Sequence, residues 1–476
     1  MKKNDLFEVT ITDLSHDGEG VGRTDAFIWF IKDTVPGDRV RASVMKMKKT
    51  YGYARLQQVL EPSPDRMEPL CPIARSCGGC TLQAMSYEAQ LAYKKRKVEE
   101  NLRRIGGFTP GSYEIFDTIG MESPWRYRNK AVYPIGTDRD GKVITGFYAG
   151  HSHTIIPCED CLIGAEENEA ILKVFREHYD DGMRHILIRQ GQASGQTMVC
   201  AVTRRRRLRQ EAEIAGALQA LGVDTFVLNC NPEETNVILG REERVIYGPG
   251  YIEDSISGLS FRISARSFYQ VNPVQVERLY GKAVEYAALT GKETVWDLYC
   301  GIGTISLAMA RQAGTVRGVE IVEAAIQDAR DNAVRNGISN AEFFVGKAEE
   351  VLPRERDAAL AAGGEAAAAA RPEVIVVDPP RKGCDEVCLA TMLEMGPDRI
   401  VYVSCDSATL ARDLKILCGG GYRLEKVQPV DMFPESVHIE VVSLLQRVSN
   451  TRERTITLDV EMEDYHRIVN GDDHNK

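Results

Sequence analysis

The sequence predicts an α/β protein in which a doubly wound, mostly parallel sheet forms the carboxyl-terminal domain and two smaller modules precede it. Three observations carry this prediction. From Ser264 onward, short apolar runs alternate with helical stretches, the pattern of strands buried on both faces. Residues 5–60 instead show short alternating strands separated by turns. Finally, a chain of 476 residues is too long for one ordinary core and long enough for two or three domains.

The composition is that of a folded protein without a membrane segment. Hydrophobic residues make up 43% and charged residues 27% of the chain. No apolar run reaches the length of about 18 residues that spans a membrane, and Met1–Asp5 does not lead into a signal-peptide pattern. We therefore expect a cytoplasmic protein with no membrane partner. Its 12 cysteines should be reduced, and thus serve as metal ligands, nucleophiles or core residues rather than disulfides.

Charge is unevenly distributed along the chain. The net charge of −10, from 59 basic and 69 acidic residues, argues mildly against a polyanionic partner. Basic residues nevertheless gather at 39–49, 94–104 and 204–207, and each such run taken alone is best interpreted as a solvated surface. Together with the aromatic-interleaved segment Trp125–Lys130 they predict an RNA-facing surface, because bases stack on aromatic rings and cations follow phosphates.

The first predicted module, residues 1–60, is a small antiparallel β-barrel. Strand-like runs such as Phe7–Ile11 and Ala26–Phe30 are separated by turns rich in glycine, proline and aspartate. With its glycine-rich turn at His16–Gly22, the pattern resembles the TRAM domain, an oligonucleotide-binding-type barrel found on RNA-modifying enzymes.

The second predicted module is residues 61–252. Pro62 and Pro64 separate it from the barrel, and a cysteine cluster follows them. Residues 87–104 have the spacing of an amphipathic helix. From about residue 113 onward, strands alternate with one or two helices, and the pattern leaves their topology open.

The cysteines of this module form a candidate metal site. Cys71, Cys77 and Cys80 supply three thiolates, and a fourth would come from Cys158 or Cys161. Four thiolates can hold an iron–sulfur cluster. Zinc is an alternative, since Cys158 and Cys161 could add two ligands, and unliganded core cysteine is another.

The third predicted module, residues 253–448, contains the doubly wound sheet. Its expected strands are 294–299, 316–319, 342–345, 374–377 and 399–403. The alanine- and glycine-rich stretch 358–370 is expected to be a helical or mobile surface insertion without chemistry of its own. A polar tail, residues 449–476, follows the module.

A nucleotide-binding layout occurs at the first two strands of this sheet. Asp297–Thr304 is a glycine-rich turn between a strand and a helix, and Glu320 ends the next strand. Glycines let the backbone approach a ligand, while the acid can accept both ribose hydroxyls. Because the turn lacks the full pyrophosphate-binding pattern, an adenosyl ligand without phosphates fits better than NAD. The turn resembles the first motif of class I methyltransferases, which bind S-adenosylmethionine in a Rossmann-like domain.

Two further motifs are expected at the same edge of the sheet. Asp378 to Arg381 places a carboxylate and two prolines after a strand, as in methyltransferases that position a base there. Amino-group methyltransferases commonly have an aromatic residue where Arg381 stands, which argues against an exocyclic amine as the acceptor. Cys405 ends another strand, and this position favours an active-site thiol over a buried core cysteine.

A thiol at Cys405 suits methylation of uracil at carbon 5. This carbon is a poor nucleophile until a thiolate adds to carbon 6, so the reaction needs covalent catalysis. Arg381 and Lys382 are candidate positive charges that favour the thiolate. A base must later remove the proton from carbon 5. Glu440, which leads into an apolar strand where desolvation would raise its pKa, is the candidate, although taken alone it would be interpreted as an exposed strand start.

In their order along the chain, these motifs resemble the RNA 5-methyluridine methyltransferase family. The match runs from the TRAM-like barrel to about Val448 and is carried by residues 268–272, 297–303, 318–320, 378–383, 404–406 and 438–440. The resemblance implies that Cys405 is the nucleophile and Glu440 the base. It also implies that four residues line the S-adenosylmethionine and uracil site, namely Gln270, Tyr299, Glu320 and Asp378.

The sequence departs from the family pattern at two positions. Cys384 stands where an aliphatic residue is expected and puts a second thiol near the predicted site, and Thr304 stands where some members have asparagine. RNA cytosine-5 enzymes often have a cysteine where Arg381 stands, so uracil remains the preferred base.

The resemblance also implies an iron–sulfur cofactor and an RNA substrate. Family members carry a [4Fe–4S] cluster bound by such a cysteine triplet and by a distant cysteine in a Cys-x-Ile context. Cys161-Leu162-Ile163 has that context, which implies the ligands Cys71, Cys77, Cys80 and Cys161. The cluster is expected to be structural or to position RNA, because methyl transfer needs no electron transfer.

The expected substrate is 23S ribosomal RNA, because the barrel and the cysteine cluster together resemble enzymes of large-subunit rRNA more than the shorter tRNA enzymes. No obligate protein partner is evident. The alternatives are methylation of tRNA uridine 54, methylation of cytosine 5 or an amino group, and a non-catalytic iron–sulfur protein that binds RNA but not S-adenosylmethionine.

Overall fold

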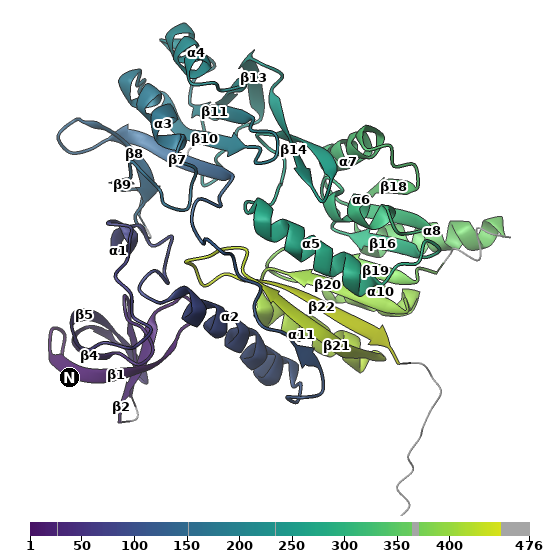
Figure 1. Cartoon of the computed structure of the whole chain (residues 1–476), viewed down its shortest axis with the longest axis horizontal. Helices are drawn as coiled ribbons and strands as arrows, with labels where there is room; N and C mark the ends of the chain where they lie inside the picture. The colour runs from purple at the N-terminus through teal and green to yellow at the C-terminus, as the bar shows by residue number, and fades with distance from the viewer. Residues whose placement is uncertain (26, 151, 234, 364–370, 449–476) are drawn as a thin grey trace, which may run out of the picture.

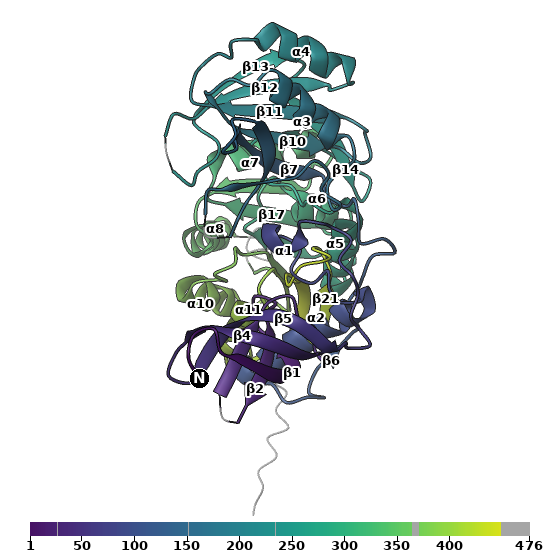
Figure 2. The same cartoon turned by 90° about the vertical axis from the view of Figure 1, so that its left-hand side faces the viewer.

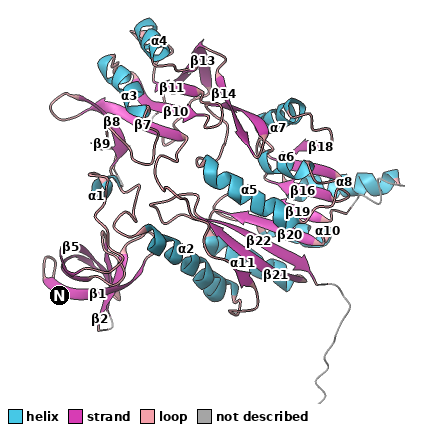
Figure 3. Ribbon diagram, in the orientation of Figure 1, coloured by secondary structure: helices cyan, strands magenta, loops and turns pink. Residues whose placement is uncertain are grey.

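The computed structural model describes residues 1–448 except 26, 151, 234 and 364–370. Three modules follow one another along the chain, a β-barrel, a central sheet with two helices and a large sheet covered by helices (Figure 1). The views in Figures 2 and 3 show the barrel and the central sheet as separate bodies that lie on either side of helix α2 and the strand ends of the large sheet. The predicted polar tail and residues 364–370 of the predicted insertion lie outside the described residues.

The first module is a closed five-stranded barrel with the strand order β1-β2-β3-β5-β4. Its strands are β1 (Leu6–Leu14), β2 (Gly20–Thr24), β3 (Phe27–Ile31), β4 (Arg39–Met47) and β5 (Tyr51–Glu61). Alternate residues of β1 point inward, and Phe7, Val9 and Ile11 pack against Trp29 in the barrel core. The period-2 pattern of the sequence therefore predicted a small barrel correctly. The expectation that all its strands are antiparallel is wrong, because β3 and β5 pair in parallel.

The central module is a seven-stranded sheet with the order β13-β12-β11-β10-β7-β8-β9. Its strands and helices are β7 (Lys130–Thr137), β8 (Val143–Tyr148), β9 (Ile155–Pro157), α3 (Asn168–Glu177), β10 (Met183–Gln190), β11 (Thr197–Thr203), α4 (Glu211–Ala220), β12 (Thr225–Cys230) and β13 (Glu242–Tyr247). Both helices share one core with one face of the sheet. Side chains of the opposite face, such as Leu187 and Cys200, belong to the core of the next module, so the two modules are packed together.

The large sheet has eight strands in the order β18-β17-β16-β19-β20-β22-β21-β6. Its strands are β6 (Glu114–Ile115), β16 (Thr294–Leu298), β17 (Thr315–Glu320), β18 (Ala341–Val345), β19 (Val374–Val377), β20 (Arg399–Ser404), β21 (Tyr422–Val430) and β22 (Glu440–Arg447). β18, β17, β16, β19 and β20 run parallel, whereas β22 is antiparallel to β20 and to β21. All five predicted strands are present, with ends shifted by at most two residues.

Helices cover both faces of the large sheet, which confirms the doubly wound prediction. The helices of one face are α5 (Pro273–Ala287), α6 (Thr304–Ala310) and α7 (Glu323–Arg335), and those of the other are α8 (Ala348–Ala362), α10 (Glu386–Met395) and α11 (Ser407–Gly419). The hairpin of β14 (Tyr251–Ile256) and β15 (Leu259–Ser264) packs beside α5 and α7. The described part of the predicted insertion is residues 358–363, of which 358–362 are the end of helix α8. No helix in the described part of the chain is long and apolar enough to cross a membrane.

Part of the predicted second module belongs to the large sheet. Helix α2 (Tyr87–Asn101) continues into a π-helical turn, η1 (Leu102–Gly106), and both pack on α11. Strand β6 then adds to the edge of the sheet by pairing with β21. Residues 61–252 therefore contribute to both sheets, and α1 (Ala74–Cys77) begins the connection between the barrel and α2.

A buried ion pair fastens α2 to the large sheet. Lys94 and Asp431 form this pair with both side chains fully inaccessible to solvent, and the Lys94 ammonium also donates to the Phe433 carbonyl at 3.1 Å. Burial lowers the pKa of Lys94, whereas Asp431 opposes that shift. The pair thus holds the segment after β21, which leads to the strand start at Glu440.

We expect Lys94→Met to destabilise the protein by about 3–5 kcal/mol, because it leaves the buried Asp431 carboxylate without its cation and with the Tyr87 hydroxyl as its remaining side-chain donor. Urea unfolding measures this difference. Lys95→Met is the matched control, since Lys95 pairs with the exposed Asp117 carboxylate, and its loss should cost less than about 1 kcal/mol. Equal stabilities of the two variants would contradict the expectation.

Candidate active site

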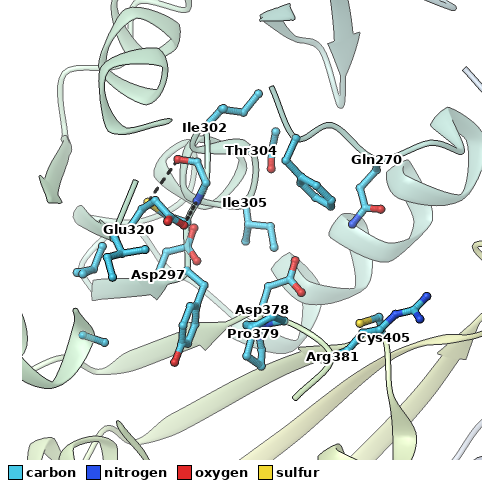
Figure 4. Close-up of a pocket in the computed structure, with 18 of the residues that line it drawn as sticks. Gln270, Asp297, Ile302, Thr304, Ile305, Glu320, Asp378, Pro379, Arg381 and Cys405 are labelled. Carbon is cyan, nitrogen blue, oxygen red and sulfur yellow. Dashed lines mark hydrogen bonds between the residues drawn. The ribbon is translucent and has the colours of Figure 1, made fainter. Parts of the chain in front are cut away.

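A cavity of about 870 Å³ opens at the carboxyl ends of the parallel strands. The six residues expected from the sequence in the cofactor, uracil and catalytic site all line it, and they are Gln270, Tyr299, Glu320, Asp378, Cys405 and Glu440. Figure 4 shows Glu320 and Asp297 at one end, Cys405 and Arg381 at the other, and Asp378 between them. Ligands of open α/β sheets bind in this position, outside the strand ends.

The glycine-rich turn after β16 forms one wall of the cavity. Gly303 precedes α6 with φ +84°, a conformation that side chains rarely adopt, and a Cβ there would lie 3.2 Å from the Phe343 ring. Tyr299 has φ +65° without being glycine, and such backbone strain is concentrated at functional sites. Glu320 accepts hydrogen bonds from the Gly301 amide at 3.3 Å and the Val322 amide at 3.0 Å. The turn therefore presents backbone and one carboxylate to the cavity.

Asp297 lies behind this turn and is fully buried. Ser306 donates a hydrogen bond to its Oδ2, whereas Oδ1 has no partner among the described residues. Burial raises the pKa of Asp297 to about 7. One carboxylate oxygen thus remains available at the cavity floor.

The loop before α5 carries Phe268 and Gln270 into the opposite wall. Asn129 of the aromatic and basic segment holds this loop, because its side-chain amide donates to the Gln270 carbonyl at 3.0 Å and its backbone amide to the Val271 carbonyl at 2.9 Å. Phe268 remains 71% exposed at the cavity mouth. The central module thereby positions part of the site.

Sheet geometry brings Glu440 next to Cys405. Cys405 directly follows β20, and Ser404 at the end of that strand is paired with Val441 of β22. Because the two strands are antiparallel, the first residue of β22 lies at the carboxyl end of β20. Glu440 is only 4% exposed, so its interpretation as an exposed strand start is wrong.

The ionisable groups at the Cys405 end of the cavity have raised pKa values. Burial raises the pKa of Asp378 to about 7, and burial together with Asp378 raises the pKa of Glu440 well above its usual range. The pKa of Cys405 is raised to about 12, first by burial and then by Glu440 and Asp378, while Arg381 opposes the shift. Arg381, one of the two candidate cations of the sequence, therefore favours the Cys405 thiolate, and protonation of Glu440 and Asp378 would remove their repulsion of that thiolate.

The two departures from the family pattern have different places in the structure. Thr304 lines the cavity, and its hydroxyl lies 3.1 Å from that of Tyr280. Cys384 does not line it. The Cys384 sulfur is buried in the core, where the Tyr402 hydroxyl approaches it at 3.6 Å. The expected second thiol is therefore near the site in sequence but faces the core.

Some residues of the lining were not predicted from the sequence. They are Ile305 and Ile321, which adjoin the predicted motifs, and residues 346–349, Tyr280 and Phe433. Residues 346–349 follow β18, so the rule that parallel strands end at one edge could have found them. Tyr280 lies on the buried face of α5 and Phe433 in an irregular segment, and neither has a local signal.

Five cysteines line a second, smaller cavity between α1 and the central sheet. They are Cys71, Cys77, Cys80, Cys158 and Cys161. Burial raises the pKa of Cys80 and of Cys158 to about 12. In residues 1–448, apart from the gaps, no group of three or more such side chains is arranged to hold a single metal ion. Four thiolates are the donor set of an iron–sulfur cluster, and this lining contains five cysteine thiols.

Comparison with known proteins agrees with this architecture. Residues 86–448 match the family model described as tRNA (Uracil-5-)-methyltransferase, and residues 2–56 match the TRAM domain. An uncharacterized RNA methyltransferase of Halalkalibacterium halodurans is 49% identical over 461 residues, which is 94% of this chain and 98% of the relative. One of Listeria innocua is 48% identical over 459 residues with the same coverage.

One solved structure is also similar over its whole length. The crystal structure of Pyrococcus abyssi tRNA (uracil-54, C5)-methyltransferase in complex with S-adenosyl-L-homocysteine has a TM-score of 0.72 and 26% identity, and the match covers 92% of this chain and 100% of that one. The fold is thus that of a class I methyltransferase with an amino-terminal TRAM barrel. The chain belongs to the tRNA (uracil-5-)-methyltransferase family, whose members are S-adenosylmethionine-dependent RNA methyltransferases.

Proposed function

We propose that this protein methylates carbon 5 of a uridine in 23S ribosomal RNA, with Cys405 as the nucleophile and Glu440 as the base. One observation carries the proposal. A half-buried thiol and a buried carboxyl group lie together at one end of a cavity whose other end carries Glu320 and the glycine-rich turn. Such a cavity has room for a methyl donor at one end and a base at the other.

The residues present fit S-adenosylmethionine. Glu320 would accept the ribose hydroxyls, the turn at Gly301 and Gly303 allows the backbone to approach the ligand, and Gln270, Tyr299 and Asp378 line the path toward Cys405. The cofactor supplies the methyl group.

The proposed chemistry uses Cys405 first and Glu440 last. The Cys405 sulfur forms a bond to carbon 6, and the electron pair of the double bond moves toward carbon 4 as an enolate. Carbon 5 then attacks the methyl group, and the sulfonium sulfur leaves with the bonding electrons. Glu440 next takes the proton from carbon 5, the double bond returns, and the sulfur leaves carbon 6 as a thiolate. Arg381 favours the thiolate at the start and at the end.

Two features support an RNA substrate of the large ribosomal subunit. The chain combines a TRAM barrel with a cysteine-lined cavity, a combination that resembles rRNA enzymes more than the shorter tRNA enzymes. A second candidate is uridine 54 of tRNA, because the similar Pyrococcus abyssi protein is named for that position. The two candidates share the same chemistry and differ in the RNA that reaches the cavity.

The test uses purified protein, S-adenosylmethionine and, in separate reactions, ribosomal RNA and tRNA lacking uracil-5 methylation. Nucleoside mass spectrometry identifies the product, and mapping of fragments locates it. New 5-methyluridine in 23S rRNA supports the proposal, and product in tRNA alone supports the second candidate. Methylated cytosine or adenine would refute both.

We also propose that Cys71, Cys77, Cys80 and Cys161 bind a [4Fe–4S] cluster with a structural role. All four line one cavity. Burial raises the pKa of Cys161, and hydrogen bonds from the backbone amides of Ile163 and Gly164 oppose that rise. Cys158 lines the same cavity, so the choice between the two is testable.

We expect anaerobically purified protein to contain iron and acid-labile sulfide in equal amounts. Cys161→Ser should lose most of both, whereas Cys158→Ser should keep them, because only the former removes a proposed ligand. Metal and sulfide analysis checks this. Zinc without sulfide would contradict the cluster. Loss of iron and sulfide in Cys158→Ser but not in Cys161→Ser would show that Cys158 is the fourth ligand.

We expect Glu320→Ala to weaken S-adenosylhomocysteine binding by about 10- to 100-fold, because hydrogen bonds from two ribose hydroxyls to a charged carboxylate are lost. Isothermal titration calorimetry measures the affinity. Glu323→Ala removes an exposed carboxylate from the first turn of α7 and should bind normally. Equal affinities of all three proteins would exclude the proposed role of Glu320.

A further inference from the structure

A small cavity lies behind Cys405 and is not part of the cofactor pocket. Cys405, Arg381 and His438 line both cavities, and the small one is completed by His16 and Lys97. These residues come from three parts of the chain, because His16 belongs to the turn between β1 and β2 of the barrel and Lys97 to helix α2. Figure 4 shows Arg381 beside Cys405.

The turn that carries His16 is held firmly in place. The Tyr93 hydroxyl of α2 donates to the Ser15 carbonyl at 3.1 Å. Gly18 of the same turn has φ +84°, and a Cβ there would lie 2.9 Å from a methyl carbon of Val437, next to His438. The glycine-rich turn of the barrel is therefore shaped to approach the catalytic segment closely.

The small cavity is rich in hydrogen-bond donors. The Lys97 ammonium uses one donor on the Val437 carbonyl, at 3.0 Å, and retains others. The Arg381 guanidinium has no hydrogen bond or ion pair with any residue that the structure describes. The one carboxylate of the lining, Asp406, accepts hydrogen bonds from the Ala408 and Thr409 amides at 2.9 and 3.0 Å as the cap of α11. The cavity thus suits an anion.

The covalent structure of uridine indicates which anion would lie in the small cavity. Carbon 6 is bonded to nitrogen 1, which carries the ribose, and it faces the 5′ side of the sugar in the common anti conformation. A sulfur that attacks carbon 6 therefore lies close to the sugar and its 5′-phosphate. Carbon 5 points away, toward the methyl donor. The groups behind Cys405 are consequently next to the phosphate and not next to the base.

We propose that His16, Lys97, Arg381 and His438 bind the 5′-phosphate of the target uridine and so set the position of carbon 6 above the Cys405 sulfur. This proposal rests on the uracil-5 chemistry proposed above. Lys97 and His16 are positioning residues, since they contact the nucleotide backbone and not the reacting atoms. The barrel then takes a direct part in placing the nucleotide, besides any wider contact with RNA.

The experiment compares two synthetic fragments of the mapped RNA, one natural and one with a neutral methylphosphonate in place of the phosphate 5′ of the target uridine. Wild-type protein, Lys97→Met, His16→Ala and the control Lys415→Met are each assayed on both. Lys415 is an exposed lysine of α11 that does not line the cavity, so its replacement removes the same charge elsewhere. Equilibrium binding of both fragments is measured alongside turnover.

We expect the methylphosphonate to raise the KM of the wild-type and Lys415→Met proteins about tenfold, as for the loss of a charged hydrogen bond, with little change in kcat. Lys97→Met should have a KM raised about tenfold on natural RNA and a smaller further rise on the methylphosphonate than wild-type protein, because the three other residues still face the phosphate. Its binding should also depend less on salt, with a slope lower by about 0.7. His16→Ala, at an exposed site, repeats the test if Lys97→Met folds poorly.

Wild-type protein that does not discriminate between the fragments would overturn the proposal, and so would variants that keep full discrimination. The proposed function fails in a different way, by the absence of 5-methyluridine on the natural fragment. In that case the difference in binding affinity between the two fragments still tests the phosphate contact, because it can be measured without turnover.

Discussion

Cys405→Ala is expected to abolish methylation, with a loss on the order of 10⁴-fold or more, because the other thiol that lines the cavity, Cys300, belongs to the glycine-rich turn at the opposite end. The measurement has two parts. The first is the rate of transfer of radiolabelled methyl groups to RNA. The second is denaturing electrophoresis after incubation with 5-fluorouridine-containing RNA, where wild-type protein should form a covalent complex, because fluorine cannot be removed from carbon 5 as a proton is.

Cys384→Ala is the matched control for this experiment. The Cys384 sulfur is buried in the core and does not line the cavity, so this variant should still form the covalent complex. Binding of S-adenosylhomocysteine by both variants shows that they are folded. A covalent complex with Cys405→Ala, or its loss in Cys384→Ala alone, would assign the nucleophile to another residue.

Glu440→Gln should uncouple the two halves of the reaction. In the proposed mechanism Glu440 acts only after methyl transfer, so the variant should still form the adduct with unmodified RNA but release it about 10²- to 10⁴-fold more slowly. The amide has nearly the shape of the buried carboxyl group and should leave the fold intact. Accumulation of a covalent protein–RNA complex on natural uridine is the diagnostic result.

The same residue predicts a pH dependence. Burial and Asp378 raise the pKa of Glu440, and only the ionised carboxylate can take a proton from carbon 5. The rate of product release by the wild-type protein should therefore increase with pH until Glu440 is ionised, and this dependence should disappear in Glu440→Gln. A variant with wild-type turnover and the same pH profile would show that another group is the base.

Much of the site follows from local sequence. The buried runs of β16, β17, β19 and β20 were recognisable as strands. The functional residue either ends its strand, as Glu320 ends β17, or directly follows it, as Asp378 follows β19 and Cys405 follows β20. Because parallel strands end at one edge of a sheet, the order of the motifs was enough to predict that these side chains meet. The TRAM barrel was predictable for the same reason, since period-2 alternation is a local property.

Only the tertiary structure decided which residues join these from other parts of the chain. Glu440 reaches Cys405 because β22 runs antiparallel to β20, and its burial depends on neighbours that no local pattern names. His16 and Lys97 reach the same place because the barrel and α2 pack against the segment before β22. The sequence by itself determined the elements, their periodicity and the chemistry at each strand end, since these depend on neighbouring residues. Contacts between modules depend on long-range packing, in which each partner is an ordinary surface residue until the fold brings them together.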